Sequence, residues 1–171
     1  MVHSLKLTTS EVELQMSTDL VPDLYELNVS KMKGSLLFFL EPGTQIHLDT
    51  NDVSRSLVTH SKSNPEWKLF LETIQVPSDK RSGSFTLGEA RARKAGNTDS
   101  LSYWAGQKVL EHNELLKKTE TFIRSHPGSF VSLYLLKNNW YAFENKQLLE
   151  TLDKSLAHHR TYTILRDKLG K

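Results

Sequence analysis

The chain has 171 residues, a mean hydropathy of -0.46 and 37% hydrophobic residues, which is typical of a globular protein and excludes a disordered one. It contains no cysteine, which excludes disulfides, thiolate metal sites and a cysteine nucleophile within these residues. Within a formal net charge of +2, residues 80–94 hold five basic side chains and one acidic side chain, but Phe85 is the only aromatic residue among them. We therefore predict no nucleic-acid partner. No apolar stretch reaches the roughly 18 residues of a membrane span, so we also predict no membrane insertion.

Up to about residue 62 the hydrophobic pattern has a period of two and predicts antiparallel strands. Apolar and polar residues alternate over residues 5–7, 12–16 and 24–29. A continuous apolar run over residues 36–40 is followed by the turn signal Glu41-Pro42-Gly43, and alternation returns over 45–49 and 55–60. We predict an incomplete, sandwich-like antiparallel β subdomain over residues 1–62.

The period becomes helical at Asn64-Pro65, where asparagine can cap a helix and proline is tolerated in its first turn. The helix is predicted to give way to residues 76–84, whose proline, glycine and charges are typical of a linker. Residues 63–79 are accordingly predicted to hold a helix and a linker. A short helix over residues 86–94 is predicted to end at Gly96.

Residues 80–171 are predicted to form an all-helical subdomain, which makes the chain an α+β protein. A long amphipathic helix is predicted from the cap Thr98 to Ser125, and Pro127 separates it from a helix over 129–137 that Ser129 caps. Further helices are predicted over 143–158 and 162–169. The two subdomains are expected to pack through aromatic residues, namely Trp67, Trp104, Phe122 and Phe130.

Catalytic and metal-binding motifs are missing from the sequence. It has no phosphate-binding loop, no His-Glu-x-x-His and no Gly-x-Ser-x-Gly. His47 and Asp49 lie on one face of a predicted strand without a third ligand, and the adjacent His158 and His159 point in different directions on a helix. We therefore predict no catalytic, cofactor-binding or metal-binding residues, no cofactor and no enzymatic activity.

An aromatic group in a predicted bend between helices is the best candidate for a binding site. Trp140 and Tyr141 follow two asparagines there, and Phe143 comes directly after. Such residues either fill the space between sheet and helices or face a partner. We predict Trp140, Tyr141 and Phe143 as partner-binding residues.

Two stretches together resemble one family. The run Phe38–Leu48, followed by Ser61–Asn64 and a helix, and the run Phe122–Ser132 are similar to segments of a domain of unknown function. That domain precedes the thioredoxin-like domain in Gram-negative envelope proteins of the thiol:disulfide interchange and peroxiredoxin-like type. The resemblance implies a non-catalytic accessory module whose partner is a thioredoxin-like domain or a substrate protein. It also implies a periplasmic location and allows a homodimer.

The sequence departs from the family pattern in two ways. It lacks the family's first strands and secretion signal, and it holds no Cys-x-x-Cys.

Two other functions remain open. The first alternative is a free-standing envelope protein that binds a small apolar or carbohydrate ligand with Trp140 and Tyr141. The second is a hydrolase with a site built from dispersed histidines and carboxylates, which no spacing supports.

Overall fold

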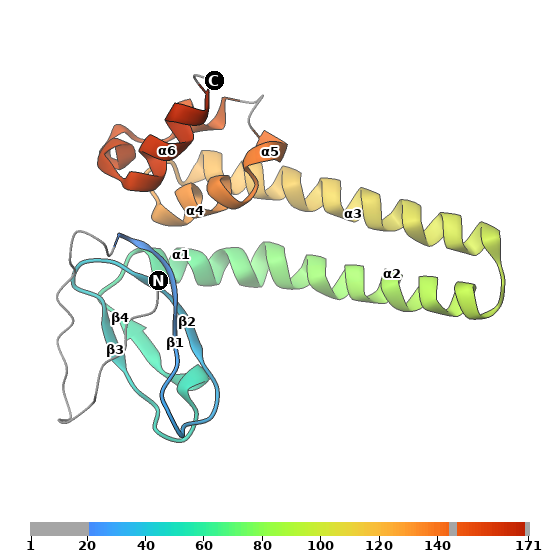
Figure 1. Cartoon of the computed structure of the whole chain (residues 1–171), viewed down its shortest axis with the longest axis horizontal. Coiled ribbons are helices and arrows are strands. Elements are labelled where there is room, and N and C mark those ends of the chain that lie inside the picture. Colours follow the sequence, from blue (N-terminus) through green and yellow to red (C-terminus); the bar gives the residue numbers. More distant parts are fainter. Residues whose placement is uncertain (1–20, 144–146, 170–171) are drawn as a thin grey trace.

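The computed structural model describes residues 21–143 and 147–169, in which a strand-rich part is followed by a helical part, as the predicted α+β class requires (Figure 1). Strand β1 (Asp23–Leu27) pairs antiparallel with β2 (Leu36–Leu40). Strand β3 (Gln45–His47) pairs antiparallel with β4 (Leu57–Thr59) after the short 3-10 turn η1 (Val53–Arg55). The strands predicted over residues 5–16 lie outside the described residues.

Strand β2 sends side chains from its two faces into different cores. Leu36 and Phe38 join Val53 in a small core between the two hairpins. Phe39 points the other way and is completely buried among the helices. Alternate residues of a strand face opposite sides, so this short strand connects the β part to the helical part.

A single continuous helix replaces the predicted linker. Helix α1 (Ser63–Phe70) passes through a π-helical turn, η2 (Leu71–Gln75), into α2 (Val76–Lys94), so the linker prediction for residues 76–84 is wrong. Pro77 lacks an N–H and would crowd the carbonyl group of Thr73 in a regular helix. The wider π turn lies directly before it, with the Val76 N–H bonded to the Leu71 carbonyl group five residues back.

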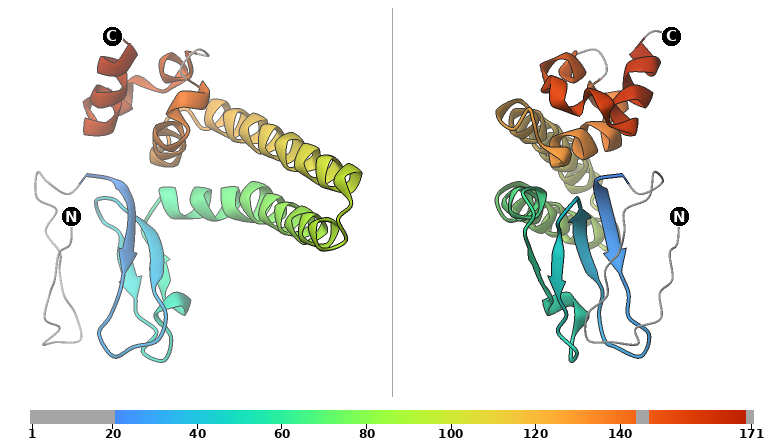
Figure 2. Two further views of the ribbon diagram at one scale, coloured as in Figure 1. Left: turned by 45° about the vertical axis from the view of Figure 1, so that its right-hand side comes forward. Right: turned by 90° about the vertical axis from the view of Figure 1, so that its left-hand side faces the viewer.

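Helices α2 and α3 (Thr98–Ser125) form a long antiparallel hairpin that projects from the rest of the molecule (Figures 1 and 2). The chain turns at Gly96, which has a φ of +64°, a value that glycine adopts without strain. Asn97 caps α3, because its side chain accepts a hydrogen bond from the Ser100 N–H. The predicted cap, Thr98, is the first helical residue instead.

Short helices cover the base of this hairpin (Figure 1). They are α4 (Phe130–Asn138), α5 (Trp140–Phe143), the 3-10 turns η4 (Leu148–Thr151) and η5 (Lys154–His158), and α6 (Arg160–Leu169). The predicted single helix over 143–158 is wrong, because the backbone is extended at Leu152 and Asp153. Asp153 donates its backbone N–H to the Pro127 carbonyl group, and its carboxylate accepts the Ser155 N–H. The bond to Pro127, which is distant in sequence, holds the backbone out of the helix that the hydrophobic pattern predicts.

The main core lies where β2, α1, α3 and α4 meet. Phe39 packs edge-on against Trp67 with ring centroids 5.8 Å apart, and Phe70 packs edge-on against Phe122 at 5.3 Å. Phe130 contacts the same core as a partly buried residue. Trp104 does not, because it lies out on the hairpin, so its predicted role between the two parts is wrong.

Polar side chains fix the joint between β2 and α1. The carboxylate of Glu41 accepts hydrogen bonds from the hydroxyls of Ser61 and Ser63 and from the backbone N–H groups of Lys62 and Ser63, at the first turn of α1. Burial raises the pKa of Glu41, but these bonds outweigh it and hold the pKa below its usual range. Asn64 pairs its side chain with both backbone groups of Phe39, at 2.9 and 2.8 Å, and therefore does not cap α1 as predicted.

The joint between α3 and α4 agrees with the sequence prediction. His126 ends α3 before Pro127, and its ring nitrogen Nδ1 lies 3.0 Å from the Phe122 carbonyl oxygen. Ser129 caps α4 by accepting the Val131 N–H at 3.0 Å. Its hydroxyl also donates to the carboxylate of Glu66 in α1. One serine thus fixes both the start of α4 and its position against α1.

Candidate interaction surface

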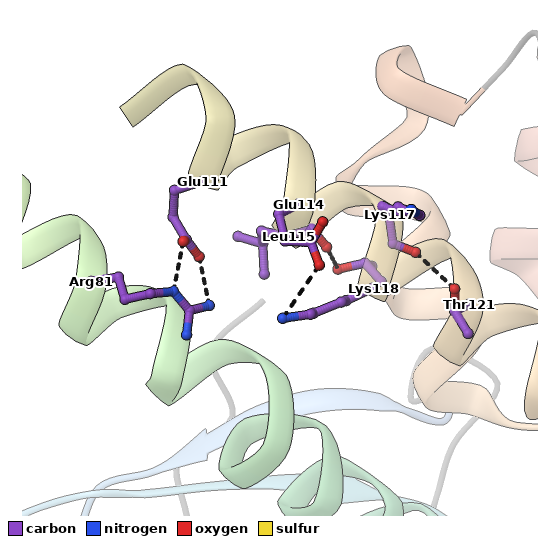
Figure 3. A network of polar contacts seen from close by, with 8 residues as sticks. Arg81, Glu111, Glu114, Leu115, Lys117, Lys118 and Thr121 are labelled. Carbon is purple, nitrogen blue, oxygen red and sulfur yellow. Dashed lines mark hydrogen bonds and ion pairs between the residues drawn. The ribbon is translucent and has the colours of Figure 1, made fainter. Parts of the chain in front are cut away.

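The hairpin is held together at its middle by an ion pair (Figure 3). Arg81 of α2 donates two hydrogen bonds to the carboxylate of Glu111 in α3, at 2.6 and 2.8 Å. These bonds from Arg81 lower the pKa of the buried Glu111, against the smaller opposing effect of burial. Nearby, Lys118 lies 3.5 Å from Glu114 of the same helix. The paired guanidinium and carboxylate fix the register of the two helices.

Toward the tip, the hairpin is held by an ion pair and by an aromatic ring. Glu89 of α2 accepts a hydrogen bond from Lys108 of α3 at 2.5 Å. The ring of Trp104 in α3 packs on Phe85 with centroids 6.1 Å apart. Gly88 leaves room for this ring, since a Cβ atom there would lie 2.5 Å from Trp104 Cε2. Because these contacts fill the inner side of α2, its opposite side is left for solvent or a partner.

That opposite side of α2 carries a stripe that we call the outer stripe. Its members recur every three or four residues, the spacing of one helical face, and are Val76, Lys80, Gly83, Leu87, Arg91 and Lys94. Leu87 exposes 62% of its surface and Val76 is also exposed. The stripe holds three cations and no acidic residue, and among the described residues none of these cations has an ion pair.

The α3 side of the hairpin also exposes apolar groups. Tyr103, Val109 and Leu110 are all exposed although they lie on a helix with many polar positions. Single exposed apolar residues are ordinary on protein surfaces, but several along one projecting hairpin are typical of a protein-binding surface.

The predicted aromatic group is divided by the structure. Trp140 is 5% exposed and Phe143 is 1% exposed, and both belong to the main core. Tyr141 is 84% exposed, and the Lys168 ammonium group lies 5.9 Å from the centroids of both Tyr141 and Trp140. Tyr141 is therefore the one member of the predicted group that a partner can reach.

The histidines weighed as metal ligands do not come together. His47 is exposed on β3, and the carboxylate of Asp49 instead accepts backbone N–H bonds from Asn51 and Asp52. His159 is half-buried and bonded to backbone, whereas His158 is exposed. Over residues 21–143 and 147–169, no three histidines, aspartates or glutamates lie close enough to hold a metal ion.

The hollows on the described surface are shallow. One lies along a single helix and is lined by α2 residues alone, namely Thr86, Glu89, Ala90, Arg93 and Lys94. Another lies between β1 and the helices, where side chains leave no space for a water molecule. Neither hollow encloses a small ligand.

Comparison with known proteins adds no assignment. No family model matches the sequence, and no curated protein and no solved structure is similar to it. Within the part of the chain that the structure describes, no helix combines the length and apolar character needed to cross a bilayer. The resemblance to the thioredoxin-associated domain stays a prediction.

Proposed function

We propose that this chain is a non-catalytic module that positions a thioredoxin-like domain or its substrate protein, with the projecting hairpin as the contacting arm. The observation that carries the proposal is the outer stripe. There the exposed Leu87 lies among unpaired cations, on a helix that its inner contacts hold against α3. Apolar side chains ringed by charges are typical of protein-binding surfaces.

The stripe also indicates the chemistry of its partner. Lys80, Arg91 and Lys94 present positive charge on a face of α2 whose stripe contains no acidic residue. Arg91 and Lys94 are also stabilised by the C-terminal end of the α2 dipole, but this explains neither Lys80, which lies farther from that end, nor the exposed Leu87. We propose a partner surface that is acidic around a small apolar pocket, because such a surface is attracted by charge and anchored by Leu87.

The resemblance supports the thioredoxin-associated and envelope parts of this proposal. Its quoted segments include Glu41 and Asn64, which fix α1 to β2, and Ser129, which fixes α4 to α1. A module whose recognisable residues serve its geometry fits a positioning role better than a chemical one. Periplasmic location follows from the same resemblance and is part of the proposal.

A binding experiment tests the proposal. The full chain is titrated by calorimetry with the purified thioredoxin-like oxidoreductases encoded in the same genome. Leu87→Glu is expected to weaken binding by at least about tenfold, because it places a charge at the contact facing an acidic partner. The matched control is Ile164→Glu, which makes the same kind of change at an exposed apolar residue of α6 and is expected to bind normally.

Three results contradict the proposal in different ways. Equal binding by wild type and Leu87→Glu would remove the outer stripe from the contact. A wild-type dimer that Leu87→Glu dissociates, seen by light scattering, would assign the stripe to a second copy of the chain. Turnover in an insulin-reduction assay by this chain alone would refute the non-catalytic role.

A further inference from the structure

The contact between the first strand and the last helix depends on one histidine ring. His159 precedes α6, and its Nε2 lies 2.8 Å from the carbonyl oxygen of Pro22, directly before β1. Its Nδ1 lies 3.1 Å from the backbone nitrogen of Thr161. A carbonyl group can only accept and an amide N–H can only donate, so the ring must be neutral with its proton on Nε2.

The surroundings of this ring disfavour a second proton. Protonation would place a hydrogen on Nδ1, facing the Thr161 N–H, and would remove that hydrogen bond. Phe130 packs on the ring with centroids 5.5 Å apart, and the hollow between β1 and the helices that His159 helps to line has no space for a water molecule.

The charged groups around the ring do not compensate for this. Asp23 of β1 is the nearby anion, but it already accepts a hydrogen bond from Lys137 of α4 at 2.6 Å. Lys137 lies above the ring of Tyr134, also in α4, and opposes a second positive charge. On its own segment, His159 is flanked by the exposed residues His158 and Arg160.

Burial is the largest cause that lowers the pKa of His159 below its ordinary value, and Lys137 adds to it, while Asp23 and the Pro22 carbonyl group oppose it. A group whose pKa is lowered by folding takes up its proton more readily when its contacts are broken. Acid below about pH 6.5 therefore favours the broken state.

We infer that His159, Pro22 and Thr161 form an acid-sensitive clamp, which ties β1 to α6 at neutral pH and releases that end of β1 when the ring takes up a proton. Release would loosen β1 against the helices, where the Lys137–Asp23 ion pair would still hold it, while Glu41 and Asn64 would keep β2 on α1. The clamp would make the geometry of the module depend on the acidity of its compartment.

NMR of the full chain tests the clamp directly. A long-range ¹H–¹⁵N correlation is expected to show His159 neutral at pH 7.5 with its proton on Nε2. Between pH 7.5 and 5.0 the Thr161 amide is expected to exchange about tenfold faster after correction for intrinsic rates, because a proton on Nδ1 removes the acceptor of its hydrogen bond. An Nδ1-protonated tautomer, or unchanged Thr161 protection at pH 5.0, would overturn the inference.

Two variants separate the clamp from general acid sensitivity. In His159→Gln the amide can still donate to Pro22 and cannot titrate, so hydrogen exchange of residues 22–28, corrected for intrinsic rates, is expected not to change between pH 7.5 and 5.0. His158→Gln changes the exposed neighbour and is expected to keep the wild-type response. A pH response of residues 22–28 in His159→Gln equal to that of wild type would refute the clamp, and the wild-type tautomer decides the matter if the variant does not fold.

Discussion

Glu41 holds a carboxylate in a buried position because helix α1 begins beside it. Four hydrogen bonds from Ser61, Lys62 and Ser63 converge on its two oxygens. Free N–H groups at a helix start attract negative charge, and the side chain therefore caps a helix from a distant position in the sequence. Lys62 occupies the cap position next to α1, but its side chain makes no capping hydrogen bond.

Replacing Glu41 by glutamine is expected to destabilise the protein by about 1–3 kcal/mol at pH 7, since a charged acceptor is lost among buried donors. The folded protein lowers the pKa of Glu41, so its carboxylate contributes stability above the unfolded value of about 4.3. That contribution is lost as the pH falls below 4.3 through the folded value. Urea unfolding of both proteins from pH 7 to pH 3 should show their difference shrinking, and a constant difference would contradict this account.

Gly88 and Gly83 provide a matched pair within one helix. A Cβ atom at Gly88 would meet the ring of Trp104, so Gly88→Ala is expected to cost about 1–3 kcal/mol by overpacking. A Cβ atom at Gly83 meets nothing within 4 Å, so Gly83→Ala is expected to stabilise by about 0.5–1 kcal/mol. Denaturant midpoints measure both, and equal shifts would mean that Trp104 moves aside freely.

Individual residues show which local signals could be predicted from the sequence. Ser129 and His126 were predictable because proline and serine act on the chain next to them. Asn64 carries the right chemistry for a cap but is engaged by the Phe39 backbone 25 residues away. The helix therefore begins at Ser63, two residues before the predicted start, because a single sequence does not reveal this long-range partner.

At the scale of elements, the α2–α3 hairpin depends on the Arg81–Glu111 pair. Arg81→Met would leave the buried Glu111 carboxylate without its bidentate partner, and is expected to lower the urea midpoint clearly. The control is Arg93→Met, whose partner Glu89 keeps its hydrogen bond from Lys108, with a smaller expected decrease. Thermal or urea unfolding measures both, and similar costs would show that the pair adds little beyond its surface charge.

The continuous helix from α1 to α2 was the largest error in predicting elements from sequence. Proline, glycine and three serines within residues 76–84 are typical of a linker. In the structure the π turn accommodates Pro77, and the hydroxyls of Ser84 and Thr86 bond to carbonyl groups four residues back. Packing against α3 then overrides weak helix propensity, which a single sequence does not reveal.

The whole molecule combines two well-packed regions with a hairpin that has few buried contacts. The main core includes Phe70 and Phe122 near the base, whereas Ala92 is the buried apolar residue near the tip. Amides of residues 86–104 are therefore expected to exchange at least about tenfold faster than those of 116–125. Hydrogen exchange with mass spectrometry measures this, and uniform protection along the hairpin would indicate that a partner or second copy covers it.

The candidate surface was less predictable than the fold. Of the aromatic residues predicted to bind a partner, Trp140 and Phe143 pack in the core, and Tyr141 is accessible. The outer stripe was hidden because the prediction divided it. Lys80 fell in the predicted linker, whereas Leu87 and Arg91 fell in the separate helix predicted over 86–94, so no common helical face aligned them. Recognising that helix first would have revealed the stripe.

Because the hairpin is long, a small rotation at its base produces a large displacement at its tip. Helix α2 alone has 19 residues and is about 28 Å long at a rise of about 1.5 Å per residue. The continuous helix from Glu66 to Lys94 is about 42 Å long, so a tilt of about 5° where Ser129 meets Glu66 would move the far end by about 3.7 Å, enough to misplace a side chain in its pocket. Substitution of Ser129, which is far from the tip, is therefore expected to weaken partner binding although every residue that contacts the partner is unchanged.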